Sequence, residues 1–272
     1  MAQKENLYIS GHSKSVLDWH SSRTAANSAA YLLASIRPDM HILDIGCGPG
    51  TITADLATLV PQGSVIGIDL GPEVIEEARS TAAKRSLKNI SFEVGDAHEL
   101  GFTDHKFDVV HAHQVLQHIS DPTHALREWQ RLIKPGGILA CREGDHGSSA
   151  TYYPANQDIA EFRNVYQKAA RARSGEPNGG RHLVAWARAA GIDRPKITAT
   201  ASVWCFSIPE ERAYWSNMWV GRLIQSPLRD NLINGGFAAD KDIDRYIKAW
   251  REWAAEEDGW GAFIHGEILC HL

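Results

Sequence analysis

The sequence predicts an α/β protein built on a parallel, doubly wound sheet. Short apolar segments alternate with segments of helical periodicity through the first half of the chain, at the spacing of βαβ units. A glycine cluster follows the first apolar segment, as at a tight turn from strand to helix. The composition, 43% hydrophobic and 22% charged over 272 residues, is that of a globular chain long enough to bury its own core.

The first half of the chain contains five expected strands. Apolar residues at helical spacing predict a helix over residues 13–35, broken near Ser21 and Ser22, and we expect residues 1–36 to form a helical cap. After that, strands and helices alternate. Strands are expected over 41–45, 64–69, 90–94, 107–112 and 137–141, and helices over 51–60, 72–85 and 122–133.

Beyond about residue 145 the regular alternation stops and tryptophan becomes frequent, with seven of nine in the last third of the chain. Helices are expected over 159–173, 180–190, 209–225 and 240–257, and strands over 197–206 and 262–271. These two strands are too far apart for a hairpin, so the helices between them form an insertion. We expect residues 37–272 to form one domain with helical insertions at about 150–180 and 208–258, the tryptophan-rich part acting as a lid.

Composition excludes several classes of protein. The 28 basic and 33 acidic residues give a net charge of −5, which does not suit a nucleic-acid binder. The four cysteines are spread singly, without the spacing of a disulfide scaffold or a zinc site, so no metal is expected. The chain has neither a signal-like nor a membrane-spanning apolar run. We therefore expect a cytoplasmic protein that does not insert into membranes, and the sequence leaves its oligomeric state open.

The glycine turn, Leu43 to Gly50, is the first segment that indicates chemistry. A strand that enters a glycine turn at the start of a helix brings backbone N–H groups close to a ligand. The spacing is G-x-G-x-G, and Thr51 stands where the dinucleotide pattern needs its third glycine. Asp44 precedes the turn, where a carboxylate would repel a pyrophosphate and suit a cationic ligand. The alternative for Asp44 is a cap on local backbone.

Two further acidic residues follow the next strands. Asp69 ends the second strand, 23 residues after Gly46, and is placed to accept hydrogen bonds from ribose hydroxyls. Asp96 follows the third strand and has no role in the dinucleotide pattern. This position suits a site where an adenine amino group is bound.

With these motifs in order, residues 8–143 resemble class I S-adenosylmethionine-dependent methyltransferases, of the small-molecule branch similar to enzymes of ubiquinone and menaquinone biosynthesis. The resemblance implies a Rossmann-like, seven-stranded sheet of order 3-2-1-4-5-7-6 with strand seven antiparallel. It also implies S-adenosyl-L-methionine as cofactor, with the glycine loop on the methionine part, Asp69 on the ribose, and Asp96 with Ala97 on the adenine. The implied cofactor-binding residues are Tyr8, His20, Arg23, Asp44, Gly46, Cys47, Gly48, Gly50, Asp69, Leu70, Asp96, Ala97, His113 and Gln114.

Candidate bases follow the fourth and fifth strands. His113 and His118 follow the fourth, and His146 follows the fifth with Glu143 and Asp145. Ligands bind beyond the carboxyl ends of strands in such sheets, so His118, His113 and His146 are the catalytic candidates. The alternative for His118 is a structural bond that fixes its loop. His111 is expected inside a strand, and Cys47 suits a tight loop better than a nucleophile.

The N-terminal segment contains Tyr8, His20 and Arg23, for which the resemblance implies a lid over the cofactor; the alternative is an amphipathic helix at the sheet edge.

We expect methyl transfer to a small, hydrophobic or aromatic metabolite, as in secondary metabolism. Two alternative functions are considered beside methyl transfer to a metabolite. One is a regulatory or non-methylating protein that binds the same cofactor, and the other, disfavoured by Thr51 and Asp96, is an NAD-dependent oxidoreductase. A methyltransferase acting on RNA or protein is a weaker alternative, since no basic strip is visible. The acceptor and the methylated atom stay open.

Overall fold

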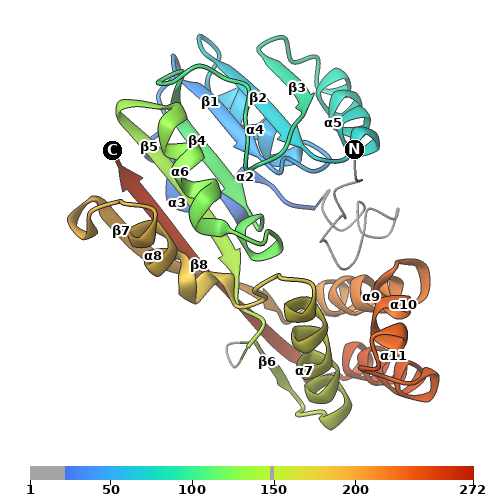
Figure 1. The fold of residues 1–272 in the computed structure, drawn as a ribbon. Coiled ribbons are helices and arrows are strands. Elements are labelled where there is room, and N and C mark those ends of the chain that lie inside the picture. The colour runs from blue at the N-terminus through green and yellow to red at the C-terminus, as the bar shows by residue number, and fades with distance from the viewer. Residues whose placement is uncertain (1–21, 148–149) are drawn as a thin grey trace.

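A central sheet with helices on both faces organises the molecule, and the computed structural model describes residues 22–147 and 150–272 (Figure 1). The strands are β1 (His41–Ile45), β2 (Ser64–Asp69), β3 (Ile90–Val94), β4 (Phe107–His113), β5 (Ile133–Gly144), β6 (Thr151–Tyr153), β7 (Ile197–Phe206) and β8 (Trp260–His271). They lie in the order β3-β2-β1-β4-β5-β8-β6, and β7 pairs with the other edge of β8. Strands β1 to β5 are parallel, whereas β8 runs antiparallel to β5, β6 and β7.

The predicted order is confirmed, because the two late strands of the prediction are β7 and β8 and take the places of strands six and seven. The prediction of seven strands is wrong by one. The short strand β6 pairs with β8 beyond the point where β5 ends, since Gly144 lies opposite His265 and Thr151 opposite Ala262. Three residues are too short a segment to show a strand periodicity in the sequence.

The helices are α2 (Ala25–Ser28), α3 (Ala30–Leu33), α4 (Thr51–Leu59), α5 (Pro72–Lys84), α6 (Pro122–Leu132), α7 (Gln157–Ala172), α8 (Gly179–Ala189), α9 (Pro209–Gln225), α10 (Leu228–Asn234) and α11 (Asp240–Ala255). Two short 3-10 turns, η1 (Leu116–His118) and η2 (Arg194–Lys196), complete the described elements. The single helix expected up to residue 35 is wrong over the described residues, because Ala29 leaves helical geometry (φ −136°) and separates α2 from α3. Residues 13–21 of that prediction lie outside the described residues.

Strand β5 is longer than predicted. We expected it to begin at Gly137, after a glycine stop, but pairing with β4 already starts at Ile133. The register then shifts between Phe107 and Val109, and Gly136 adopts a positive φ of 78°. The proline and glycine residues that indicate a turn in the sequence are therefore accommodated by a bulge within the strand.

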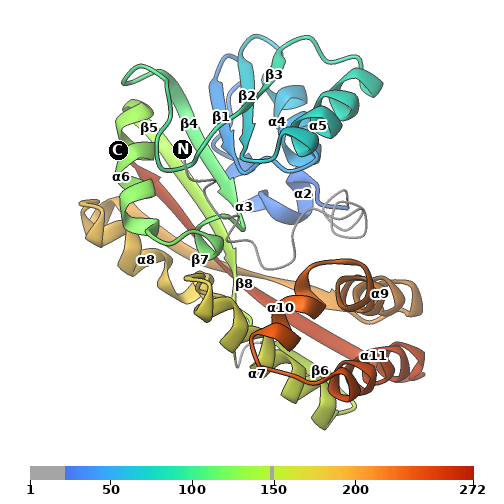
Figure 2. The ribbon, with the colours of Figure 1, turned by 45° about the vertical axis from the view of Figure 1, so that its right-hand side comes forward.

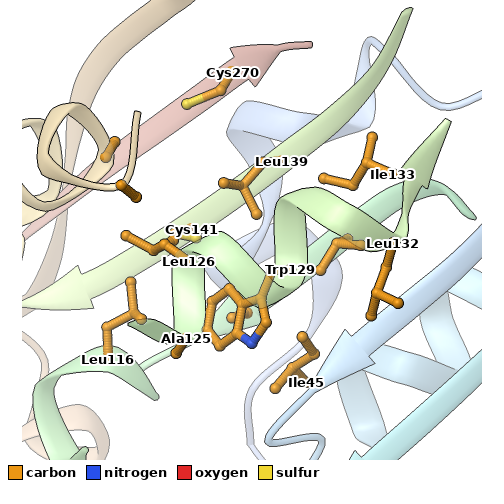
Figure 3. Packing of buried hydrophobic residues seen from close by; sticks show 14 of the residues in the cluster. Ile45, Leu116, Ala125, Leu126, Trp129, Leu132, Ile133, Leu139, Cys141 and Cys270 are labelled. Atoms are coloured by element: carbon orange, nitrogen blue, oxygen red, sulfur yellow. The ribbon is translucent and has the colours of Figure 1, made fainter. Parts of the chain in front are cut away.

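Each face of the sheet has its own hydrophobic core. Helices α2, α3 and α4 pack on one face, and α6 and α8 on the other. Trp129 of α6 is fully buried among side chains of α6, β1 and β5 (Figure 3), and its indole donates to the carbonyl of Ala97 at 2.8 Å. This bond ties α6 to the loop that follows β3.

A third core lies in the C-terminal part of the chain. Helices α7, α9, α10 and α11 gather around the first residues of β8, away from α4 and α5 (Figures 1 and 2). Trp215, Trp219, Trp250 and Trp253 belong to this core. Trp250 packs edge-on against Trp253 and parallel to Trp219, so much of the tryptophan surplus holds the helices together.

Candidate active site

A cavity of about 580 Å³ begins at the carboxyl ends of β1, β2 and β4 and continues to the tryptophan-rich helices. One end is formed by residues 44–48, Asp69, Leu70, Asp96 and Ala97, and we call it the cofactor end because the sequence resemblance implies cofactor binding by these residues. Its other end, the aromatic lobe, is formed by Tyr166, Trp215, Met218, Trp219, Arg222 and Phe263. The size is that of a small-molecule site.

The glycine loop forms one wall of this cavity. Gly46, Gly48 and Gly50 all have positive φ, at 66°, 54° and 77°. A Cβ on Gly46 would lie 2.3 Å from a methyl carbon of Val115, so only glycine lets the loop after β1 approach the loop after β4. Gly50 then begins α4, whose first turn directs backbone N–H groups toward the loop. Cys47 is buried with a raised thiol pKa, which does not suit a nucleophile.

Asp69 lies where the parallel register brings the end of β2 beside the loop. Its carboxylate accepts from the backbone N–H groups of Gly48 at 3.1 Å and Gly71 at 3.2 Å, and it lines the cavity. Asp96, beside Ala97 in the same wall, accepts from the backbone and lies 2.9 Å from the ring of His98. The acidic residues after β2 and β3 thus face one space, as the sequence predicts.

Asp44 is buried, and both of its oxygens have partners within the protein. One lies 2.7 Å from Nδ1 of His111, and the other accepts from the hydroxyl of Thr53 at 2.6 Å. The residue still lines the cavity. These bonds join β1 to α4 and β4 through two side chains, whereas the alternative left open by the sequence was a cap on local backbone. His111 lies inside β4 and is fully buried, as expected.

A polar network crosses the cavity wall after β4. Arg23 donates to the side-chain oxygen of Gln114 at 2.6 Å, and the amide nitrogen of Gln114 lies 2.9 Å from Nε2 of His265. Gln114 has a positive φ of 56°, a conformation that non-glycine residues seldom adopt. Arg23 also lies 5.9 Å from the Trp204 ring, so it joins the N-terminal segment to both β4 and β7.

The three candidate histidines differ in their surroundings. His118 has Nε2 3.0 Å from the amide nitrogen of Gln117, which supports a loop-fixing role. His113 is 5% exposed, and neither ring nitrogen has a hydrogen-bond partner among the described residues. His146 packs against Phe263 and Tyr166, with ring centroids at 4.6 and 5.1 Å, and lines the cavity.

Glu143 and Asp145 are engaged in structure. The fully buried carboxylate of Glu143 accepts from the backbone N–H groups of residues 115, 116 and 117, and thereby fixes the loop after β4. Burial raises its pKa to about 8, although these three donors oppose the shift. Asp145 forms a bidentate ion pair with Arg181 at 2.5 and 2.6 Å. Neither carboxylate is placed to serve as a base.

These buried groups predict that stability depends on pH. Burial lowers the pKa values of His113, His146 and His265 below the usual 6.5. The unfolded chain takes up protons there below about pH 6.5 while the folded chain does not, so stability falls with falling pH. Glu143 opposes this, because its raised pKa gives stability that is lost as pH rises toward 8. Because three histidines act in one direction and only Glu143 acts in the other, we expect the free energy of unfolding to fall by roughly 2 kcal/mol when the pH is lowered from 6.5 to 5.5.

Urea unfolding at both pH values measures this difference. The His265→Gln variant, which removes one of the three histidines, should show a smaller loss. An equal loss in the variant would contradict the assignment.

Some site residues were not predicted and others cannot be placed. Tyr8 and His20 lie outside the described residues. Within the described part of the chain, no group of three or more His, Cys, Asp and Glu residues is arranged to hold a metal ion. Trp204, Arg222 and Tyr166 also line the cavity, and their lining roles were not predicted from the sequence. For Arg222 a signal existed, since it lies three and seven residues after Trp219 and Trp215 on one face of α9.

Comparison with known proteins identifies the family. Residues 36–191 match the family model described as "Methyltransferase domain", and this chain belongs to that family. An uncharacterized methyltransferase of Schizosaccharomyces pombe is 35% identical over 96% of this chain and 95% of its own length. A probable methyltransferase of Aspergillus luteorubrus, ltbC, is 31% identical over 97% of both chains. A demethylmenaquinone methyltransferase of Symbiobacterium thermophilum is 37% identical over 39% of this chain and 43% of its own.

Solved structures show the same fold. The YcgJ protein of Bacillus subtilis has a TM-score of 0.56 at 20% identity, covering 88% of this chain and 96% of its own. A phosphoethanolamine N-methyltransferase of Haemonchus contortus, in complex with S-adenosylhomocysteine, has a TM-score of 0.51 at 18% identity, covering 86% and 49%. The family match and the full-length relatives identify the chain as a methyltransferase that uses S-adenosyl-L-methionine. No described helix combines the length and the apolar character that crossing a membrane requires.

Proposed function

We propose that this enzyme transfers the methyl group of S-adenosyl-L-methionine to a small hydrophobic or aromatic metabolite. The observation that carries the proposal is the continuity of one cavity from the glycine loop to the aromatic lobe. Four of the six lobe residues have aromatic rings, and such walls suit flat apolar molecules. All six lobe residues are buried, at 5% exposure or less, which favours a metabolite over a macromolecule.

The residues of the cofactor end fit this cofactor. Asp69 offers carboxylate oxygens to ribose hydroxyls, Asp96 lies beside Ala97 where the adenine would be held, and the glycine loop offers backbone to the methionine part. Arg23 supplies positive charge suited to the cofactor carboxylate. When bound, the cofactor supplies an activated methyl group on a positively charged sulfur.

The chain's own residues then have two tasks. Rigid walls hold the acceptor in line, and orientation alone provides a large part of the rate in such transfers. A base is needed only where the acceptor atom arrives protonated. Among the three candidates His146 has the strongest claim, because it contacts the aromatic lobe, with its ring centroid 4.6 Å from that of Phe263. Burial lowers the pKa of His146 below its usual range, so its ring is neutral at pH 7.

We expect His146→Phe to lower kcat by about 100-fold or more, because the ring packing stays and the basic nitrogen is lost. The affinity for S-adenosylhomocysteine, measured by calorimetry, should not change. His118→Ala is the paired variant, which also removes a ring nitrogen from the cavity wall. Should His118→Ala lose turnover across the pH range while His146→Phe retains it, the base is His118.

Incubation of the enzyme with S-adenosylmethionine labelled on the methyl group and a metabolite extract of the host tests the proposal. A labelled small product that depends on the enzyme is the expected result. The alternative is a protein that holds the same cofactor without transferring its methyl group. A protein described as the (4+2)-cyclase SpnF has a similar fold, at a TM-score of 0.50 and 20% identity over 92% of this chain and 79% of its own, so the fold by itself does not require methyl transfer. Cofactor binding without any labelled product would favour that alternative.

A further inference from the structure

His113, the last residue of β4, places a buried imidazole in the wall of the cavity. The residue is 5% exposed, and neither of its ring nitrogens has a hydrogen-bond partner among the described residues. Strand β4 pairs with β1, which leads into the glycine loop. The His113 ring lies 6.0 Å from the Trp204 ring, which lies 6.3 Å from that of Phe263 in the aromatic lobe, both measured between centroids. His113 therefore connects the two ends of the cavity.

The imidazole of His113 can form two hydrogen bonds that the described residues do not supply. Burial, together with the positive charges of Arg23 and Arg142, lowers its pKa, so the ring is neutral at pH 7. A neutral imidazole has one nitrogen that donates and one that accepts. Buried groups of this kind are rarely left unpaired in folded proteins, because each unpaired group lowers stability. A ligand in the cavity would pair both nitrogens.

Two further uncharged side chains in the cavity wall have unpaired polar atoms. Gln117 is 3% exposed, and its side-chain oxygen lacks a partner in the described part of the chain, whereas its amide nitrogen lies 3.0 Å from Nε2 of His118. Trp219 is 2% exposed, and its indole N–H also lacks a partner there. Both residues line the cavity. With His113, the wall thus offers unpaired donors as well as unpaired acceptors.

A hydroxyl is the substituent that matches this set of groups. Carboxylate and ketone oxygens only accept hydrogen bonds and an ammonium group only donates them, whereas a hydroxyl does both through one atom. We infer that the acceptor of this methyltransferase is an aromatic compound bearing hydroxyl groups, one of which is hydrogen-bonded to the imidazole of His113. The inference rests on the proposed function, and it names the substrate class and a specificity-determining residue for the same site.

Binding of matched probes to the full-length protein, saturated with S-adenosylhomocysteine, tests the inference by calorimetry. The probes are 2-naphthol, 2-methylnaphthalene, which has a similar shape without the hydroxyl, and 2-methoxynaphthalene, which accepts but cannot donate. We expect 2-naphthol to bind about 10-fold or more tightly than either analogue, because the analogues leave polar groups of the wall unpaired. A wall without a polar anchor would prefer the two more apolar analogues. Equal or weaker binding of 2-naphthol by the wild-type protein would therefore overturn the inference.

Three variants locate the effect. His113→Phe keeps a ring and removes both nitrogens, so it should lose most of the preference for 2-naphthol. His113→Gln restores an uncharged donor and acceptor and should recover part of that preference, which a role in packing alone would not produce. His182→Phe is the matched control, since His182 of α8 stacks on Trp186 and does not line the cavity. A preference that survives His113→Phe in full would overturn the inference.

Binding of S-adenosylhomocysteine by the same samples separates the acceptor class from the proposed function. Normal binding by the wild-type protein with no preference for 2-naphthol refutes the acceptor class and leaves methyl transfer standing. Failure of the wild-type protein to bind S-adenosylhomocysteine refutes the proposed function itself, and the acceptor class with it. If His113→Phe loses affinity for S-adenosylhomocysteine and keeps the probe preference, His113 serves the cofactor and the inference is wrong. The comparison of probes on the wild-type protein needs no substitution, so it decides the question even if a variant does not fold.

Discussion

Gly266→Ala should lower the free energy of unfolding by about 3 kcal/mol or more. Gly266 lies in β8, between Glu143 of β5 and Ala201 of β7, where α8 packs directly on the sheet. A Cβ at this position would lie 2.1 Å from the carbonyl oxygen of Gly180. Both groups belong to backbone in regular elements, so neither can move aside by a rotamer change, and the helix would have to shift away from the sheet.

Urea unfolding followed by tryptophan fluorescence measures this loss as a lower midpoint. Gly101→Ala is the matched control, because a Cβ there meets nothing within 4 Å and the residue does not have a positive φ. We expect that control to unfold within a few tenths of a kcal/mol of the wild-type protein. Equal midpoints for the two variants would show that the contact between α8 and β8 is not tight.

Asp69→Ala should weaken binding of S-adenosylmethionine by roughly 2–3 kcal/mol, the scale of hydrogen bonds from two hydroxyls to a charged group. In the structure the same carboxylate also accepts from the N–H groups of Gly48 and Gly71, so it both orders the loop and faces the cavity. Calorimetry with S-adenosylhomocysteine measures the loss, and unchanged affinity would refute the ribose role of Asp69.

A ligand comparison separates the ribose role from the loop-ordering role. The 2′-deoxy form of S-adenosylhomocysteine should bind the wild-type protein more weakly than the natural compound does. On the Asp69→Ala variant the deoxy and the natural compound should bind with about equal affinity. If the deoxy form loses as much affinity on the variant as on the wild type, Asp69 acts through the loop alone. Glu73→Ala, an acidic residue in the first turn of α5 that does not line the cavity, controls for the loss of charge.

The cofactor end of the cavity could be predicted closely from the sequence, because its information is local. A strand, a glycine turn and a helix start are contiguous, and β1, β2 and β3 have the bounds that the apolar runs predict. In a parallel sheet the carboxyl ends of these strands meet at one edge, so Asp69 and Asp96 had to face the glycine loop once the strand order was known.

The remainder depended on contacts between distant segments. Glu143 carries no signal in the sequence as the group that fixes residues 115–117, and Asp44 gives no sign that His111 and Thr53 occupy both its oxygens. The bulge in β5 and the short strand β6 also depend on pairing with neighbours. Local periodicity cannot report hydrogen bonds made across the sheet.

The sequence by itself determined the class of fold, because strand periodicity and a glycine turn depend on neighbouring residues, and its resemblance to a known family implied the strand order and the cofactor. Only the tertiary structure decided which tryptophans form a core and which line a cavity, and that Arg222 shares that cavity with His146. The physical reason is that the aromatic lobe forms where Trp219 of α9 packs on His146 after β5, and these two segments lie far apart along the chain.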